Sequence, residues 1–358
     1  MKPTRALNEI GQSLWLDNVS RDMLDSGTLK RYIDELSVTG LTSNPTIFDH
    51  AITHSAAYDS DIRRLILEGQ TGDGLFFELA LDDLRRAADL LLPIHEQTTG
   101  VDGWVSIEVS PLLADAAKET VAQAKSLHDK AKRRNLYVKI PGTREGLLAI
   151  EDAIFSGAPI NVTLLFSTEQ YVASAEAYMR GLERRAVAGL SLNVESVASL
   201  FVSRWDRAVA DKVPDRLRNK LGIAVGRQAY KAYRDLLESD RWQRLANKGA
   251  RPQRLLFASM GTKDPKAPDV LYVGALAAPN TVDTMPEATL LALADHGVVG
   301  KPIPRDGGDA ENVLADFRKA GIDLAALAAQ LQTEGAKAFV ESWYDLLRAI
   351  ETKSKALN

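Results

Sequence analysis

Lys139 lies in the middle of an apolar stretch, where an ionised side chain is costly. The surrounding residues 136–142, LYVKIPG, predict a short buried strand that ends at Pro141 and Gly142. Burial disfavours the ammonium form of a lysine, and the neutral amine is a nucleophile towards carbonyl groups. The position of Lys139 therefore predicts a lysine that forms a Schiff base with a carbonyl substrate.

Other polar residues interrupt predicted strands with the same alternation of faces. Side chains alternate along a strand, so one face of a barrel strand points into the barrel and the other packs on helices. The positions expected to pack on helices are apolar. The opposite positions hold Asp17, Asn44, Glu108, Lys139, Asn161 and Thr163. Most of these residues lie near the carboxyl ends of their strands, where barrel active sites are built, so we expect them to converge on one site.

Each of these residues has a structural alternative when it is taken alone. A lone strand lysine usually lies at a sheet edge or pairs with a carboxylate, and Glu108 and Asp17 would serve as such partners. Asn44 before Pro45 is typical of turn chemistry, and the polar residues of 160–167 would be hydrogen-bonded core residues. Shared alternation across five strands favours the functional interpretation over these alternatives.

A lysine with two carboxylates suits carbon–carbon bond chemistry on a sugar. Forming and hydrolysing an imine requires proton transfers, which a carboxyl group can perform directly or through one positioned water. The protonated imine then accepts electrons as a carbon–carbon bond breaks, while a second carboxylate takes the proton of the neighbouring hydroxyl. Asparagine, threonine and serine side chains can hold a polyhydroxylated substrate. The constellation predicts a metal-free, class I aldol-type enzyme.

The elements that position these residues predict an α/β protein. Strand-like segments alternate with helical ones, as is typical of a parallel sheet. The expected strands are 13–19, 40–48, 104–111, 136–142, 160–167, 197–205, 254–261 and 270–276. Eight such units predict a (β/α)8 TIM barrel with additional helices at the termini, and residues 1–358 are expected to form one domain. A doubly wound open sheet is the alternative, although DNVSRD after the first strand is not a glycine-rich phosphate loop.

Composition excludes several classes of function. The formal net charge is −4, without a basic block, which disfavours nucleic acid and anionic membranes as partners. The chain has no cysteine, and none of its five histidines forms an HxH or HExxH pair, so we expect neither a metal nor a cofactor. No signal peptide or membrane span is visible, and we expect a cytoplasmic protein.

At these residues the sequence resembles the transaldolase family, in its longer bacterial form. The matching segments keep the family's order and span about residues 13 to 290. They are SLWLDNVSRD, GLTSNPTIF, GWVSIEVSP, YVKIPGTREG, INVTLLFS, SLFVSRWD, LLFASMGTKDP and VDTMPEATL. The resemblance implies a transaldolase of the pentose phosphate pathway. Such an enzyme moves a dihydroxyacetone unit from sedoheptulose 7-phosphate to glyceraldehyde 3-phosphate, giving erythrose 4-phosphate and fructose 6-phosphate.

The resemblance also implies roles for the catalytic residues. Lys139 matches the Schiff-base lysine, and Asp17 matches the acid/base that deprotonates the C4 hydroxyl. Glu108 matches the carboxylate that acts through a water held by Thr163. The residues that match binders of the dihydroxyacetone portion are Asn44, Asn161 and Ser199.

Phosphate binding is implied at Arg204 and at Ser259. Shorter transaldolases carry an arginine soon after that serine, whereas this chain reads SMGTKDP, so Lys263 is taken as the substitute cation. Phe201 matches a phenylalanine of transaldolases where related fructose 6-phosphate aldolases carry tyrosine. An apolar ring there favours transfer over release, and ordinary core packing is its alternative role.

Two other functions compete with transaldolase. A fructose 6-phosphate aldolase shares the chemistry, but such relatives are shorter, and Phe201 argues against it. A catalytically silent barrel that serves as a binding or scaffold module has no need of a buried Lys139. Expected partners are small sugar phosphates, with the chain itself a monomer or a homodimer.

Overall fold

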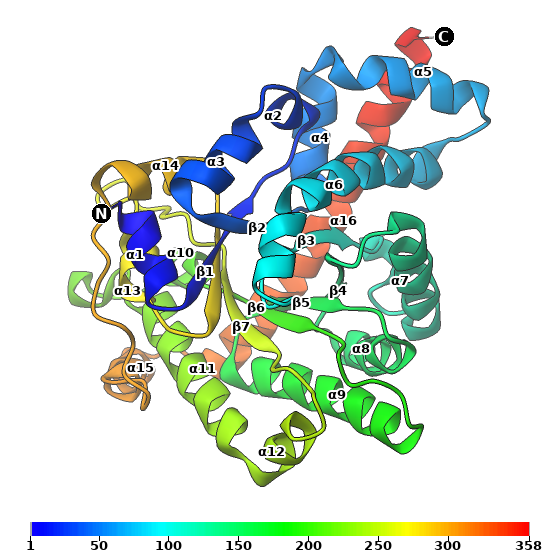
Figure 1. Cartoon of the computed structure of the whole chain (residues 1–358). Coiled ribbons are helices and arrows are strands. Elements are labelled where there is room, and N and C mark those ends of the chain that lie inside the picture. The colour runs from blue at the N-terminus through cyan, green and yellow to red at the C-terminus, as the bar shows by residue number, and fades with distance from the viewer. Residues whose placement is uncertain (1, 358) are drawn as a thin grey trace.

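Eight parallel strands form a nearly closed barrel in the computed structural model, which describes residues 2–357 (Figure 1). The strands are β1 (Gln12–Asp17), β2 (Val38–Thr42), β3 (Val105–Glu108), β4 (Leu136–Pro141), β5 (Ile160–Leu165), β6 (Ser196–Phe201), β7 (Arg254–Ala258) and β8 (Thr281–Met285). Their hydrogen-bonded order is β2-β1-β8-β7-β6-β5-β4-β3. A bridge between Gly40 and Trp104 links the remaining two edges, β2 and β3, and the Leu41 amide donates to the Trp104 carbonyl at 2.9 Å. The expected (β/α)8 barrel is confirmed.

Helices surround this barrel and extend beyond it. They are α1 (Pro3–Glu9), α2 (Arg21–Asp25), α3 (Thr28–Leu36), α4 (Pro45–His54), α5 (Asp59–Leu67), α6 (Gly72–Gln97), α7 (Ala117–Ala131), α8 (Arg144–Ser156), α9 (Thr168–Val187), α10 (Ser203–Val209), α11 (Leu221–Glu238), α12 (Asp240–Ala246), α13 (Leu271–Ala275), α14 (Glu287–His296), α15 (Ala310–Lys319) and α16 (Leu324–Leu357). Short 3₁₀ turns are η1 (Ala56–Tyr58), η2 (Pro111–Leu113) and η3 (Asp215–Leu217). The additional terminal helices are therefore present as expected.

The prediction of the eighth strand is wrong. Residues 271–275, inside the expected strand 270–276, form the short helix α13, and the eighth strand is TVDTM, Thr281–Met285. A short, continuously apolar run does not distinguish a strand from a buried helix, because it has no period to read. The true strand carries two threonines and an aspartate, so it lacks the apolar composition from which a buried strand is predicted.

Most predicted strands extend past the observed carboxyl ends, and two of them, 40–48 and 197–205, run into the α-helix that follows. Pro45 begins α4 only three residues after β2 ends, and Ser203 begins α10 two residues after β6 ends. Proline is favoured in the first turn of a helix, where its missing N–H costs nothing. The polar residues that follow each strand therefore lie at the junction between strand and helix, above the barrel.

Aromatic side chains fill the barrel beneath that junction. The Trp104 and Tyr137 rings stack with their centroids 4.0 Å apart, and the Trp15 ring lies 6.1 Å from Tyr137. Gly40 allows this packing, because a Cβ there would lie 2.5 Å from Trp15 Nε1. The interior of the barrel below the strand ends is therefore filled by side chains.

The long helix α16 crosses the barrel on the way to the carboxyl terminus. In Figure 1 it runs behind the strands, from beside β6 and α11 to α4 and α5. It contacts β5 as well as α4, α5 and α6. Trp343 fixes it in place with edge-on packing against Phe76 (centroids 5.1 Å apart), and Lys353 Nζ pairs with Asp59 at 2.9 Å.

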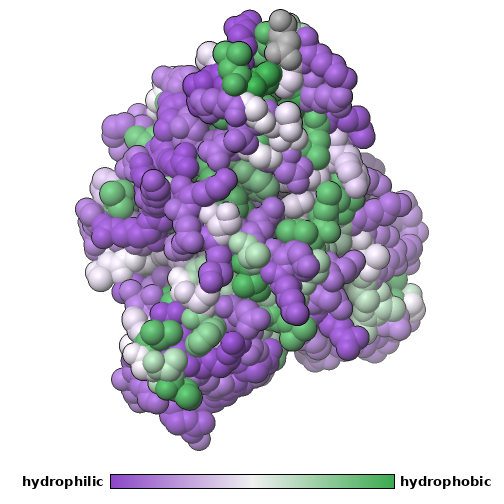
Figure 2. All heavy atoms as spheres, turned by 90° about the vertical axis from the view of Figure 1, so that its right-hand side faces the viewer, coloured by the Kyte–Doolittle hydropathy of each residue, from purple (hydrophilic) through white to green (hydrophobic). Residues whose placement is uncertain are grey.

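The outer surface is mainly hydrophilic on the face that Figure 2 shows, and its hydrophobic side chains lie in small separate patches. Within residues 2–357, no helix combines the length and the apolar character that crossing a bilayer requires.

Candidate active site

Strand register brings three of the predicted residues side by side. Glu108 on β3 pairs with Lys139 on β4, and Lys139 pairs with Asn161 on β5. Paired residues of parallel strands point to the same side of a sheet, so all three side chains enter the barrel. Lys139 Nζ lies 3.4 Å from Glu108 Oε2, and the two residues are only 5% and 4% exposed.

Glu108 is an under-bonded carboxyl group. Neither of its oxygens has a hydrogen bond within residues 2–357. Its Oε2 lies within ion-pair distance of Lys139 Nζ, but the two groups do not form a well-aligned hydrogen bond. Burial raises the pKa of Glu108 to about 7, with the nearby Asp17 adding to the rise and Lys139 opposing it. A carboxyl group with this pKa can both donate and accept a proton near neutral pH.

Thr163 shares this lack of partners. Its hydroxyl is buried at the end of β5 and has no hydrogen-bond partner in the part of the chain that the structure describes. Buried polar atoms are nearly always satisfied by protein or by ordered water. The Glu108 carboxylate and the Thr163 hydroxyl thus retain hydrogen-bonding capacity for a small polar molecule.

Asp17 approaches from the carboxyl end of β1. Its Oδ1 accepts a hydrogen bond from the Thr42 hydroxyl at 2.7 Å, and Thr42 also bonds the Thr284 hydroxyl on β8 at 2.8 Å. This chain of hydroxyls fixes the carboxylate at the rim. Asp17 and Lys139 both line one cavity, as the alternation of faces predicts.

That cavity, with a volume of about 130 Å³, gathers most of the predicted site residues. Its walls are formed by Asp17, Thr42, Asn44, Lys139, Thr163, Ser199, Phe201, Arg204, Ala258, Ser259, Gly261, Lys263, Thr284, Pro286 and Phe339. Two predicted residues, Glu108 and Asn161, are not part of this wall. The Asn161 amide is bonded within the barrel, because it donates to Ser106 Oγ at 3.2 Å and accepts from Ser199 Oγ at 2.7 Å.

Asn44 combines the two interpretations that its sequence position allowed. Its side chain caps α4 by accepting a hydrogen bond from the Ile47 amide at 3.1 Å. It also lines the cavity. Capping fixes the side chain in one orientation, which prepares it to contact a ligand.

The three predicted phosphate-binding residues, Arg204, Ser259 and Lys263, all line the cavity. Arg204 Cζ lies 5.0 Å from the centre of the Phe201 ring, and burial together with Arg207 lowers the pKa of Arg204. Ser259 follows β7 in a left-handed conformation (φ +57°), and its hydroxyl lies 3.0 Å from that of Ser203. Lys263 contributes the second cation.

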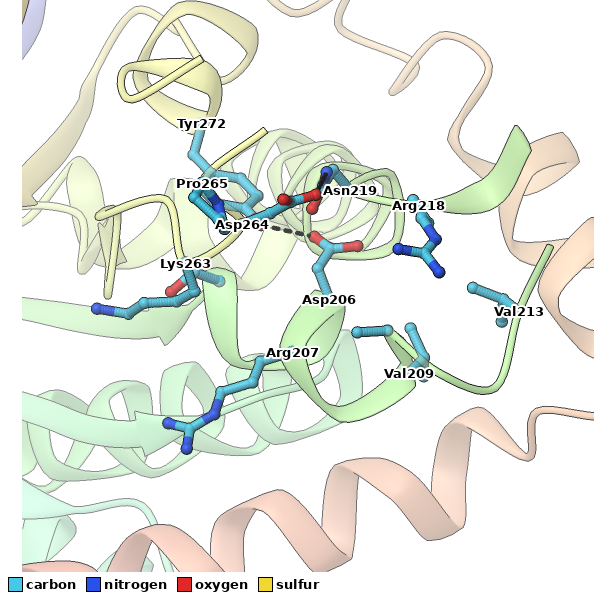
Figure 3. Close-up of a pocket in the computed structure, with 12 residues that line it drawn as sticks. Asp206, Arg207, Val209, Val213, Arg218, Asn219, Lys263, Asp264, Pro265 and Tyr272 are labelled. Carbon is cyan, nitrogen blue, oxygen red and sulfur yellow. Dashed lines mark hydrogen bonds between the residues drawn. The ribbon is translucent and has the colours of Figure 1, made fainter. Parts of the chain in front are cut away.

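Lys263 also borders a neighbouring cavity of about 240 Å³, shown in Figure 3. In that view Lys263 and Arg207 extend to the same side, away from Arg218. The buried carboxylate of this second cavity is already committed, since Asp206 accepts hydrogen bonds from the Leu221 amide (2.9 Å) and the Tyr272 hydroxyl (3.0 Å). Asp206 therefore helps to hold α10, α11 and α13 together beside the site.

Six residues of the cavity wall were not predicted as site residues, and the reasons are clear for three of them, Thr42, Thr284 and Phe339. Thr284 was missed because its strand was assigned to the wrong segment. Thr42 shares the inward face of its strand with Asn44, so the alternation alone would have found it. Phe339 on α16 carried no signal for this position, because helical periodicity shows which residues are buried but not against what.

No group of three or more His, Asp or Glu is arranged to hold a metal ion within residues 2–357. The site described above offers an amine, two carboxyl groups and several hydroxyls for chemistry. This arrangement suits covalent capture of a carbonyl compound with assisted proton transfer.

Comparison with known proteins supports this assignment. The family model described as Transaldolase/Fructose-6-phosphate aldolase matches residues 14–350. A transaldolase of Parafrankia sp. (strain EAN1pec) is 43% identical over 98% of this chain and 97% of the relative. A transaldolase of Thermobifida fusca (strain YX) is 44% identical over 96% of both chains. A transaldolase of Mycobacterium tuberculosis (strain CDC 1551 / Oshkosh) is 45% identical over 96% of this chain and 95% of the relative.

These matches confirm the expectation of a transaldolase-type enzyme. They cover the strands that carry every predicted site residue as well as most of α16. The chain belongs to the transaldolase/fructose-6-phosphate aldolase family.

Proposed function

We propose that the chain transfers a dihydroxyacetone unit between sugar phosphates through an imine on Lys139. The observation that carries this proposal is the buried pair of Lys139 and Glu108, 3.4 Å apart beside the cavity at the carboxyl end of the barrel. Relatives at 43–45% identity that are named transaldolase support the choice of reaction. The donor would be sedoheptulose 7-phosphate or fructose 6-phosphate, in the cytoplasmic pentose phosphate pathway.

In the first step the Lys139 amine adds to the ketone carbon of the donor. The hydroxyl so formed takes a proton that comes from Glu108 through a water bonded to Thr163, and it leaves as water. A protonated imine results. Both Glu108 oxygens and the Thr163 hydroxyl have free bonding capacity within residues 2–357, and the pKa of Glu108, raised to about 7, suits a proton donor and acceptor.

In the second step Asp17 takes the proton of the C4 hydroxyl. The bond between C3 and C4 breaks, its electron pair moves into the imine to form an enamine, and the aldehyde product leaves. An acceptor aldehyde then forms a new bond to the enamine carbon, and its oxygen takes the proton back from Asp17. The hydrogen bond from Thr42, 2.7 Å long, holds Asp17 in place for both transfers.

The remaining cavity residues would hold the substrate. Asn44 and Ser199 would bind the hydroxyl groups of the dihydroxyacetone portion, and Asn161 would act through its hydrogen bond with Ser199. Arg204, Ser259 and Lys263 would bind the phosphate, and this is supported by the fact that all three line the same cavity as Lys139. The chain is expected to work as a monomer or a homodimer.

The experiment that tests this function compares transfer with release. The enzyme is incubated with fructose 6-phosphate, with and without erythrose 4-phosphate, and the products are quantified. We expect rapid formation of sedoheptulose 7-phosphate with the acceptor and slow release of dihydroxyacetone without it. Release at the same rate as transfer would instead identify a fructose 6-phosphate aldolase, and no turnover in either assay would favour a silent barrel.

A further inference from the structure

One face of α16 is turned toward the mouth of the barrel. Gln332, Gly335 and Phe339 are spaced three and four residues apart, which places them on the same side of a helix. All three make contacts with strand ends or with site residues. We call these three residues the inner face of α16.

Gln332 ties this face to two strands of the site. Its Nε2 donates to the carbonyl of Gly142, just after β4, at 3.1 Å, and to the carbonyl of Leu164, in β5, at 3.0 Å. Leu164 has a left-handed backbone (φ +59°), which is unfavourable for a non-glycine residue, and it follows Thr163 directly. Gln332 thus links α16 to the strands that carry Lys139 and Thr163.

Gly335 allows the helix to approach closely. A Cβ at this position would lie 2.9 Å from Leu164 Cδ2 and 3.3 Å from Arg204 Nη1. A larger residue would therefore displace the Leu164 and Arg204 side chains from their present positions, or α16 itself. Two features allow α16 to lie close to the site: Gly335 has no side chain, and Gln332 forms hydrogen bonds to two strand ends.

Because α16 lies this close to the strands, Phe339 reaches the cavity. Its ring centre lies 5.6 Å from Lys139 Nζ, the side chain is 7% exposed, and it forms part of the cavity wall. The other named neighbours of the amine are polar, namely the Glu108 carboxylate at 3.4 Å and the Ser43 carbonyl at 3.3 Å. Phe339 therefore supplies an apolar neighbour from outside the barrel.

An apolar wall at this position bears on the fate of the enamine. In transfer, the enamine carbon forms a bond to the acceptor aldehyde carbon. In release, the same carbon takes a proton from solvent, and water then adds to the imine carbon, breaks the carbon–nitrogen bond and frees dihydroxyacetone and the Lys139 amine. Excluding water from a closed site suppresses such side reactions.

We propose that Phe339 is a specificity-determining residue that favours transfer over release. Gln332 and Gly335, the other two residues of the inner face of α16, hold it over Lys139. This inference rests on the imine proposed for Lys139. It assigns to the carboxyl-terminal helix a part in choosing the product, beyond its part in the fold.

The test measures the ratio of dihydroxyacetone released to sedoheptulose 7-phosphate formed, with fructose 6-phosphate and erythrose 4-phosphate as substrates. Phe339→Ala opens the wall to water, so we expect the ratio to rise about tenfold. Phe339→Leu keeps an apolar side chain at the position and should stay within about twofold of the unaltered enzyme. Tyr344→Ala, on an exposed position of the same helix (47% exposed), is the matched control and should leave the ratio unchanged.

Borohydride trapping separates failure of this inference from failure of the proposed function. If the unaltered enzyme cannot be trapped with fructose 6-phosphate, the imine itself is refuted. If Phe339→Ala is trapped as well as the unaltered enzyme and yet shows the same product ratio, only the role of Phe339 is overturned. If Phe339→Ala does not fold, Gln332→Ala takes its place, since loosening the helix must also raise the ratio; an unchanged ratio there overturns the inference.

Discussion

Two pairs of buried ionisable groups, one at each end of the barrel, differ in the hydrogen bonds that surround them. At the amino end the Arg254 guanidinium has three partners: it donates to the Ser13 hydroxyl and to the Val101 carbonyl, each at 2.7 Å, and lies 3.8 Å from Asp102. Asp102 in turn accepts a hydrogen bond from the Trp15 indole at 2.8 Å. Arg254 and Asp102 therefore both have partners that compensate for the loss of water.

At the carboxyl end the compensation is incomplete. Lys139 and Glu108 approach to 3.4 Å, but both Glu108 oxygens and the Thr163 hydroxyl lack a hydrogen bond within residues 2–357. Burying polar groups without partners costs free energy of folding. The comparison shows two ways to bury a charged group: Arg254 and Asp102 have several partners, whereas Glu108 beside the cavity keeps hydrogen-bonding capacity that a substrate or a water can use.

Lys139→Met tests whether the buried charge at the carboxyl end serves chemistry and not stability. We expect all transaldolase activity to disappear, because no amine remains to form the imine, while the approximate shape of the side chain is kept. Stability should hardly change, since the variant removes a buried cation and Glu108 can become neutral by binding a proton. The melting temperature, measured at pH 6, should stay within about 2 °C of the unaltered enzyme. Residual activity, or a collapse of stability, would place Lys139 among the structural residues.

The converse change at the amino end is Arg254→Met. Removing this cation leaves Asp102 buried beside it, so we expect the free energy of unfolding to fall by about 3 kcal/mol. The turnover number of the folded enzyme should remain within about twofold, because the strand ends that carry the site are untouched. Denaturant unfolding and steady-state kinetics measure the two effects. Arg5→Met, which removes an exposed ion pair with Glu9, is the control and should cost less than about 1 kcal/mol.

Glu108→Gln tests whether the Glu108 carboxyl group transfers a proton. We expect imine formation to slow about 100-fold, because the amide cannot transfer the proton, while the KM for fructose 6-phosphate changes little. A large rise in KM with unchanged turnover would contradict the proton-transfer role.

The pH dependence gives a second measure of the same residue. Since burial raises the pKa of Glu108 to about 7, only at lower pH is it protonated and able to donate, so imine formation should slow as pH rises through about 7. Glu108→Gln should lose this dependence. The same shift makes folding less favourable as pH rises from about 4.3, where the unfolded chain ionises, to about 7, where the folded chain does.

The smallest effects are expected at the phosphate side of the cavity. Arg204→Gln should raise the KM for fructose 6-phosphate about tenfold, because a guanidinium can form two parallel hydrogen bonds with a phosphate. Lys263→Gln should raise it about threefold, since an ammonium group acts as a single point charge. Unphosphorylated fructose is the control substrate, and its KM should not respond to either change. Equal effects on both substrates would show that these cations do not bind the phosphate.

Much of the fold and of the site was predictable because both depend on simple alternation. Polar residues at every second strand position identify the inward face, and parallel pairing then brings Glu108, Lys139 and Asn161 together in register. The eighth strand was not predictable in this way. Residues 270–276 form a continuous apolar run, which is typical of a buried strand, whereas three of the five residues of Thr281–Met285 are polar. Thr284 was lost with that strand.

Contacts made by the terminal helix were beyond sequence reasoning for a different reason. A helical pattern identifies Phe339, Trp343 and Leu346 as a buried side, but it does not say which surface buries them. The answer depends on the Gln332 hydrogen bonds to two strand ends, which join residues far apart in the sequence. Three-dimensional packing alone reveals that Phe339 faces Lys139.

The most direct test of the account is reductive trapping with fructose 6-phosphate and borohydride, followed by peptide mapping. Reduction converts an imine into a stable secondary amine, so the modified lysine is identified by mass. We expect a single dihydroxyacetone adduct, located on Lys139, and no adduct in Lys139→Met. An adduct on any other lysine, or an unmodified chain under conditions of full turnover, would contradict the imine at Lys139.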